Sequence, residues 1–130
     1  KNTLIDSLED IGIVNKTIVD MGGSLGSLYL NYKSFFSNNS ANYIVVEQNE
    51  VCEKGRIIAS QFNLPIEFVD SINKIQNNID IVICSSFLQY IEEWRTYVDS
   101  IISCKPEFII VDRHPLSESD SKIYVQLKKL

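Results

Sequence analysis

The sequence has few of the residues on which several common classes of protein depend. Its 130 residues include one histidine and three cysteines, and no two cysteines have CxxC spacing. Cys52, Cys84 and Cys104 lie in apolar surroundings. We therefore predict three reduced thiols in the core of a cytoplasmic protein, and neither a disulfide framework nor a metal site.

Long apolar runs and basic runs are also lacking. The longest uncharged apolar stretch covers residues 81–91, far short of the ~20 residues that a membrane span needs. Asp6, Glu9 and Asp10 interrupt the first apolar residues, so no signal peptide is predicted there. The net charge is −5, from 12 basic and 17 acidic residues, which argues against nucleic acid as the main partner.

The composition is that of one globular domain. Hydrophobic residues make up 45% of the chain and charged residues 22%, and we predict a single domain over residues 1–130 with its own core. The sequence starts at a lysine and stops at a strand-like segment. We therefore expect it to be a piece of a longer protein.

Short apolar runs alternate with segments of helical spacing. Five β-branched runs have the continuous apolar character of strands buried on both faces of a parallel sheet. These runs cover residues 17–19, 43–46, 66–69, 79–83 and 108–111. Residues 122–127 alternate and predict a sixth, half-exposed strand.

Three helices are expected to face the core with apolar stripes. The stripes are Leu4, Ile5, Leu8 and Ile11; Val51, Ile57, Ile58 and Phe62; and Ile91, Trp94, Val98, Ile101 and Ile102. Gly55 should weaken the second helix, residues 50–63, by about 1 kcal/mol. The third helix is expected over residues 92–103, with Glu92 and Glu93 in its first turn, at the positive end of the dipole.

This order predicts an α/β fold with an open, Rossmann-like, mostly parallel sheet in three α/β/α layers. Ligands of such sheets bind outside the carboxyl ends of the strands. The segments that follow the five strands are residues 20–26, 47–48, 70–71, 85–86 and 112–114. Four of the five begin with a carboxylate, so the predicted site is rich in hydrogen-bond acceptors.

The first of these segments is rich in glycine. Gly22, Gly23 and Gly26 allow positive φ and a close approach of ligand to backbone, although a plain tight turn is an alternative. The dinucleotide fingerprint fails because Ser24 stands where it needs its second glycine. A phosphate loop fails because it would need a lysine in this segment. A nucleotide-dependent oxidoreductase is therefore disfavoured.

The other segments suit an adenosine ligand. Glu47 can accept hydrogen bonds from both hydroxyls of a ribose, and Asp70 can accept one from an exocyclic amine. Ser85 and Ser86 are small enough to let a ligand tail lie across the sheet. These parts match S-adenosylmethionine, whose sulfonium cation also suits an acidic site.

With these residues the chain resembles the class I S-adenosylmethionine-dependent methyltransferases, and within them a family encoded among bacterial surface-polysaccharide genes. The matching pieces are residues 19–27, 45–48, 85–90 and 109–115, within a region from about residue 17 to residue 127. The resemblance implies methyl transfer to a small molecule or sugar intermediate.

The resemblance also assigns residues to parts of the cofactor. It implies that the loop from Asp20 to Gly26 contacts the methionine part. It implies Glu47 at the ribose with Gln48 beside it, and Asp70 and Ser71 near the adenine. Gly26 is expected where the turn enters a helix and the backbone meets ligand, so a valine there should block binding and leave a folded protein.

The chain departs from the broad superfamily in three ways. Ser24 replaces the middle glycine of the loop, and Gln89 stands where many small-molecule methyltransferases have a histidine. By resemblance the sheet has seven strands, the last one antiparallel between the fifth and sixth. Because the sequence supplies six, we expect the seventh to be missing. The open edge of a sixth strand could then pair with a second copy, giving a homodimer.

The substrate side leaves alternatives open. His114 could be a general base or a loop histidine before Pro115. Asp112 and Arg113 could orient a hydroxylated substrate or pair with each other. Gln89 and Tyr90 could line the site of methyl transfer. The rival to a methyltransferase is a cofactor-binding module that has lost catalysis and serves a partner protein.

Overall fold

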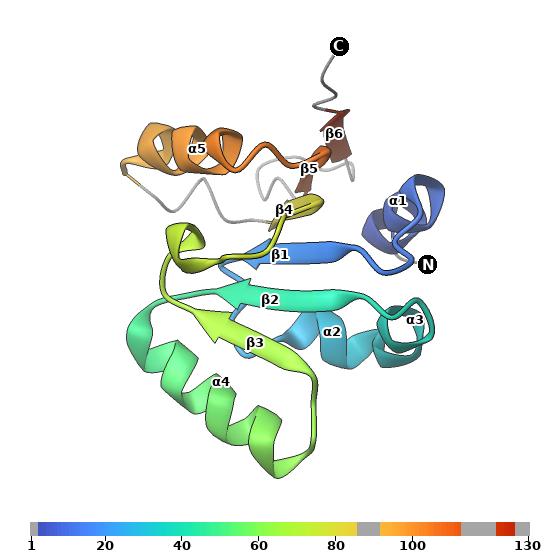
Figure 1. Cartoon of the computed structure of the whole chain (residues 1–130), viewed down its shortest axis with the longest axis vertical. Helices are drawn as coiled ribbons and strands as arrows, with labels where there is room; N and C mark the ends of the chain where they lie inside the picture. The colour runs from blue at the N-terminus through green and yellow to red at the C-terminus, as the bar shows by residue number, and fades with distance from the viewer. Residues whose placement is uncertain (1–2, 86–91, 113–121, 127–130) are drawn as a thin grey trace.

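The chain forms one six-stranded sheet. The computed structural model describes residues 3–85, 92–112 and 122–126. The strands are β1 (Thr17–Met21), β2 (Asn42–Val46), β3 (Ile66–Val69), β4 (Ile81–Ser85), β5 (Phe108–Asp112) and β6 (Lys122–Gln126). Their order across the sheet is β3-β2-β1-β4-β5-β6 (Figure 1). The first five strands run parallel and β6 pairs antiparallel with β5.

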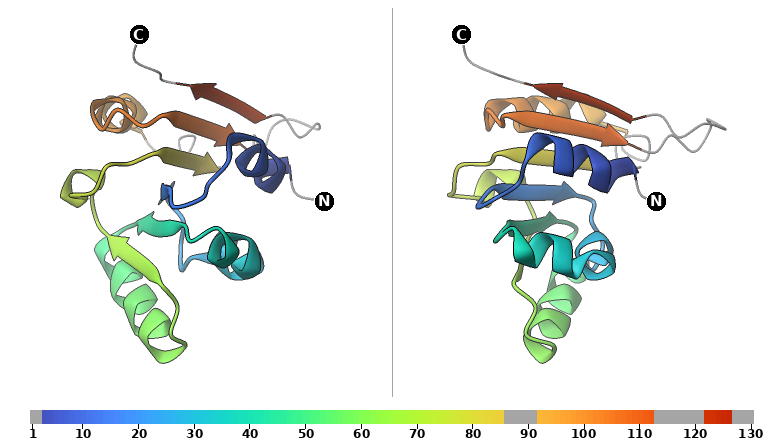
Figure 2. Two further views of the ribbon diagram at one scale, coloured as in Figure 1. Left: turned by 45° about the vertical axis from the view of Figure 1, so that its right-hand side comes forward. Right: turned by 90° about the vertical axis from the view of Figure 1, so that its right-hand side faces the viewer.

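Helices cover both faces of this sheet, as predicted. They are α1 (Thr3–Ile11), α2 (Ser27–Asn31), α3 (Lys33–Asn38), α4 (Asn49–Gln61), the short 3-10 helix η1 (Ile72–Lys74) and α5 (Trp94–Ser103). Buried residues of α1 to α4 share one core cluster, and those of η1 and α5 share the other. The two views of Figure 2 show these layers. The structure thus has the open Rossmann-like arrangement that the alternating sequence indicates.

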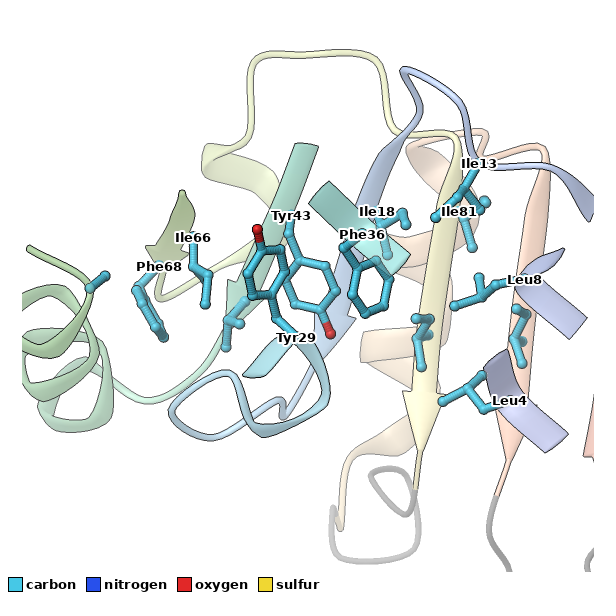
Figure 3. Packing of buried hydrophobic residues seen from close by; sticks show 14 of the residues in the cluster. Leu4, Leu8, Ile13, Ile18, Tyr29, Phe36, Tyr43, Ile66, Phe68 and Ile81 are labelled. Atoms are coloured by element: carbon cyan, nitrogen blue, oxygen red, sulfur yellow. The ribbon is translucent and has the colours of Figure 1, made fainter. Parts of the chain in front are cut away.

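An aromatic cluster holds α2 and α3 against the sheet. The rings of Tyr29 and Phe36 lie 5.5 Å apart, and each lies about 5 Å from the ring of Tyr43 in β2 (Figure 3). Helices of five and six residues are marginal alone. Burial of such side chains contributes roughly 1.5–3 kcal/mol each, which offsets that weakness. The segment between β1 and β2 is therefore fixed mainly by its rings.

Helix α4 buries a face that only partly matches the predicted stripe. Its buried residues are Cys52, Gly55 and Ala59, whereas Ile57 is 66% exposed and Phe62 is 63% exposed. A Cβ atom added to Gly55 would lie 2.4 Å from the ring of Phe68. The helix packs so closely on β3 that only small residues fit between them. The prediction was wrong for Ile57 and Phe62, whereas Val51 and Ile58 are half-buried beside the small residues of the contact.

The last helix also differs from its prediction. It begins at Trp94, so Glu92 and Glu93 precede it, and its first turn holds no acidic residue. Ile101 is buried, whereas Ile102 is 50% exposed. Adjacent helical positions point about 100° apart, so a narrow contact with the sheet buries only one of them.

β2 and β3 end where the apolar runs predict, whereas β1, β4 and β5 end further along the chain. β4 covers Ile81–Ser85 instead of residues 79–83, and Asp80, directly before it, bonds to the first residue of β1. The Thr17 amide N–H donates to Asp80 Oδ2 at 2.8 Å, and the Asp80 amide N–H donates to Thr17 O at 3.0 Å. Asp20 and Asp112 lie within β1 and β5, not beyond them. Both carboxyl groups are therefore part of the sheet.

The antiparallel direction of β6 was not predicted. Its place beside β5 and its direction are those that the family resemblance gives to the final strand of a methyltransferase sheet. Burial is described only for Gln126, which is exposed, so the predicted half-exposure of this strand stays a prediction. Among the described residues, no helix is long and apolar enough to cross a membrane.

Candidate functional site at the carboxyl edge of the sheet

The glycine-rich loop between β1 and α2 lies against the end of β2. The Gly22 amide N–H donates to Val46 O at 2.8 Å, and the Gly26 amide N–H donates to Gly23 O at 3.0 Å. The backbone turns through left-handed φ values of 67° at Gly22, 56° at Ser24 and 89° at Gly26. For Ser24 this conformation costs about 1–2 kcal/mol, which a glycine would avoid. The loop is strained at the position where the chain departs from the superfamily.

Glu47 fastens this loop to the second strand. One oxygen of its half-buried carboxylate, Oε2, accepts the Ser24 amide N–H at 2.9 Å. The other, Oε1, accepts the Gln48 amide N–H at 3.0 Å. A carboxylate has about four acceptor positions, so each oxygen can accept a further hydrogen bond. Glu47 can therefore hold the loop and bind hydroxyl groups at the same time.

Asp20 lies directly beneath the loop. It is only 4% exposed, and its Oδ2 accepts a hydrogen bond from the Tyr43 hydroxyl at 2.5 Å. A Cβ atom added to Gly23 would lie 2.6 Å from Oδ2 of Asp20, so the loop passes over the carboxylate with no room for a side chain. Burial raises the pKa of Asp20 to about 6; the Tyr43 hydrogen bond lowers it and the charge of Glu47 raises it.

Gly26 lies at the start of α2 and close to the core. It is the N-cap of α2, as predicted, but a Cβ atom there would lie 2.9 Å from Cδ1 of Ile66 in the core. A valine at this position would press on the packing of β3 and strain the left-handed backbone. We therefore expect the substitution to cost stability as well as binding, and whether the protein stays folded remains a prediction.

The residues after β3 line a cavity. Asp70 is exposed and its Oδ1 lies 2.6 Å from Lys74 Nζ; the hydrogen bond from Lys74 is the main cause that lowers the pKa of Asp70. Ser71 caps η1, with its Oγ accepting the Asn73 amide N–H at 3.2 Å. The cavity beside them has a volume of about 200 Å³ and is lined by Met21, Val46, Asp70, Ser71, Ile72 and Ser100, among others. Its lining combines the apolar side chains of Met21, Val46 and Ile72 with a majority of polar residues, so it can take a ligand that has both an apolar face and hydrogen-bonding groups.

A larger hollow, of about 460 Å³, lies elsewhere. Its lining includes Asn42, Tyr43, Leu64 and Pro65, which are at or before the amino ends of β2 and β3. No residue of the glycine-rich loop lines it. Since ligands of open parallel sheets bind at the carboxyl ends, the smaller cavity is the better candidate.

The fourth and fifth strands bring two further predicted residues together. Ser85 and Asp112 pair in register as the last residues of β4 and β5, Ser85 half-buried and Asp112 only 7% exposed. Ser86, Gln89, Tyr90, Arg113 and His114 lie outside the described residues. Their roles stay predictions.

Sequence reasoning missed Tyr43. The alternation of β2 places Tyr43 and Val45 on one face, and Val45 pairs in register with Asp20. The signal in the sequence was the position of Tyr43, two residues before Val45, which is the residue that pairs with Asp20. It could be used only once the register between β1 and β2 was known.

Known structures share this architecture. A chain of the Pnkp1/Rnl/Hen1 RNA repair complex aligns with a TM-score of 0.69 and 12% identity, covering 84% of this chain and 27% of that one. A SAM-dependent methyltransferase from Aquifex aeolicus aligns with a TM-score of 0.66 and 16% identity, covering 90% and 67%. Coclaurine N-methyltransferase, bound to N-methylheliamine and SAH, aligns with a TM-score of 0.65 and 12% identity, covering 85% and 35%.

These similarities show the fold. The chain has the Rossmann-like fold of the methyltransferases, and it spans between 27% and 67% of the lengths of the three proteins. No family model matches the sequence, and no curated protein matches it.

Proposed function

We propose that this chain binds S-adenosyl-L-methionine at the carboxyl edge of its sheet and serves methyl transfer to a small molecule or sugar intermediate. The observation that carries the proposal is the glycine-rich loop, which lies over Asp20 and is fastened to Glu47 on a fold that methyltransferases share. Both carboxylates are then beside a loop whose backbone a ligand can approach.

The loop suits the methionine end of the cofactor. Within the described part of the chain, the amide N–H groups of Gly23 and Leu25 have no hydrogen-bond partner. Backbone N–H groups in such turns bind anions, so they can hold the cofactor's carboxylate. The negative charges of Asp20 and Glu47 favour its ammonium and sulfonium cations.

The second and third strands suit the adenosine end. Glu47 has acceptor positions left for the ribose hydroxyls, with Gln48 beside it. The cavity between η1 and α5 offers the apolar side chains of Met21, Val46 and Ile72 to a planar ring, and polar residues around them. Asp70 and Ser71 are among the residues that line it and can accept a hydrogen bond from the adenine amine. A cavity of about 200 Å³ is smaller than a whole-ligand site, which suits a binding site for the ring alone.

The cofactor supplies an activated methyl group, so the chain's own part is to bind, orient and exclude water. For a hydroxyl acceptor, Asp112 and His114 are the proposed proton acceptors, with Gln89, Tyr90 and Arg113 on the substrate side. The similarity of residues 85–90 and 109–115 to methyltransferases of surface-polysaccharide genes supports a sugar substrate and a cytoplasmic location.

Calorimetric titration tests the proposal. We expect saturable binding of S-adenosylmethionine and S-adenosylhomocysteine, and none of NAD. Transfer of a labelled methyl group to pools of sugar nucleotides then tests catalysis. Binding without transfer would favour the non-catalytic module, and absence of binding would refute the proposal.

A further inference from the structure

We propose that Tyr43 is a positioning residue for the cofactor: its hydroxyl holds the Asp20 carboxylate beneath the glycine-rich loop in the ionised state. The inference rests on the proposed function and adds to it a residue that does not touch the ligand. The ring of Tyr43 is buried among Tyr29 and Phe36, so the hydroxyl has one fixed direction (Figure 3).

Contacts on two sides fix the orientation of the Asp20 side chain. Tyr43 donates to Oδ2 from β2, and Gly23 closes over the same oxygen from above. Asp20 is thus held between a donor below and a loop whose Gly23 amide is not bonded within the described residues. Only the backbone of the loop would then separate the carboxylate from a ligand on the outer side of the loop. In this low-dielectric setting its charge acts on a nearby cation more strongly than in water.

The other groups around Asp20 disfavour its negative charge. Burial raises the pKa of Asp20 to about 6, and the carboxylate of Glu47 at the end of β2 raises it as well. From β4, the thiol of Cys84 has a pKa raised to about 12, by burial first and by Asp20 second, so it stays neutral. Among these influences on the pKa of Asp20, only the hydrogen bond from the Tyr43 hydroxyl favours the ionised form. Loss of that hydroxyl should therefore neutralise Asp20 at a pH where the native site is charged.

The test compares Tyr43→Phe with Tyr29→Phe. Each variant removes one hydroxyl from a buried ring of the same cluster, and within the described residues only Tyr43 bonds to Asp20 through its hydroxyl. Affinity for S-adenosylhomocysteine is measured by calorimetry between about pH 5 and about pH 8, where Asp20 titrates. We expect wild-type affinity to fall below about pH 6. In Tyr43→Phe this midpoint should move up by about one pH unit, the size of a lost hydrogen bond to a charged group.

A second measurement does not depend on the cofactor. Carbon-13 NMR of the Asp20 carboxyl group, titrated in the free protein, should show the same upward shift in Tyr43→Phe and none in Tyr29→Phe. If Tyr43→Phe does not fold, Asp20→Asn replaces it: binding should then be weaker and should show no midpoint near pH 6.

The outcomes separate the two proposals. If the wild-type protein binds no cofactor at any pH, the proposed function fails, and with it a role for Tyr43 in binding. If the wild type binds but Tyr43→Phe keeps the wild-type midpoint, or Tyr29→Phe shifts as much, the role of Tyr43 is refuted while the proposed function stands. An Asp20→Asn variant with wild-type affinity would also refute it.

Discussion

Burial of the ionised Asp20 carboxyl group lowers the stability of the folded protein. Its pKa is raised from 3.8 to about 6, so the folded state binds its proton more tightly than the unfolded state does. Between about pH 4 and about pH 6 the stability must therefore fall as the pH rises, and above about pH 6 the full cost remains. A shift of about two units corresponds to roughly 3 kcal/mol at most. Residues kept at such a cost are frequent at functional sites.

We predict that Asp20→Asn stabilises the cofactor-free protein by about 1–2 kcal/mol near pH 7.5, because an amide can accept from Tyr43 without a buried charge. Urea unfolding at neutral and at acid pH measures this. The gain should shrink as the pH falls through about 6 and vanish toward about pH 3, below both pKa values, where Asp20 is protonated in both states. Asp10→Asn, at an exposed position of α1, is the control and should change little. A less stable Asp20→Asn at neutral pH would contradict the argument.

Glu47 accepts a hydrogen bond from the glycine-rich loop and has acceptor positions left for a ligand. We predict that Glu47→Ala weakens cofactor binding by roughly ten- to a hundred-fold, because charge-assisted bonds to the ribose are lost and Ser24 loses its partner. The melting temperature without ligand should barely move, since water can replace a half-exposed carboxylate. Glu50→Ala, in the exposed first turn of α4, is the matched control. Unchanged affinity in Glu47→Ala would exclude the ribose role.

At the scale of elements, the contact between α4 and β3 depends on a missing side chain. Gly55 is unfavourable for helix formation, yet the ring of Phe68 occupies the space of its Cβ. We predict that Gly55→Ala destabilises the protein by about 1–3 kcal/mol despite its better helix propensity, because the buried ring must move. Urea unfolding is the measurement. Ser60→Ala, at an exposed position of the same helix, is the control and should be neutral or slightly stabilising. If Gly55→Ala were more stable than the wild type, the ring of Phe68 would be able to move at little cost and the prediction would be wrong.

The order of elements could be predicted from the sequence, whereas their contact faces could not. Alternating periodicity identifies buried strands and amphipathic helices, and it correctly indicated α1 through Leu4 and Leu8. It missed part of the buried face of α4 because small residues at a close contact carry no apolar signal. In the candidate site, the positions of Asp20 and Glu47 at the carboxyl edge follow from strand order. The bond from Tyr43 to Asp20 depends on register, which a single sequence does not specify.

At the scale of the whole molecule, the sheet separates two cores, and Cys84 lies in the second. Its pKa is raised to about 12, by burial and by the charge of Asp20, so at about pH 8 it is a protonated, inaccessible thiol. We predict that iodoacetamide modifies Cys84 only when the protein unfolds, and that bound cofactor slows this further. Mass spectrometry of the peptides follows the rate. The half-buried Cys104 is the internal reference and should react sooner; equal rates would show that the core opens locally at β4.

The pairing of β1 also determines the order in which its two strand pairs can form during synthesis. Val19 pairs with Ile44 on one side and with Val82 on the other, so one neighbour of β1 is synthesised well before the second. Closing the longer chain segment costs more entropy, and non-local parallel pairing is slow. The partners that fix the loop, Tyr43 and Glu47, belong to the early neighbour or follow it directly. A growing chain can therefore assemble the glycine-rich loop on the ribosome while the opposite face of the sheet is still uncovered and prone to aggregation.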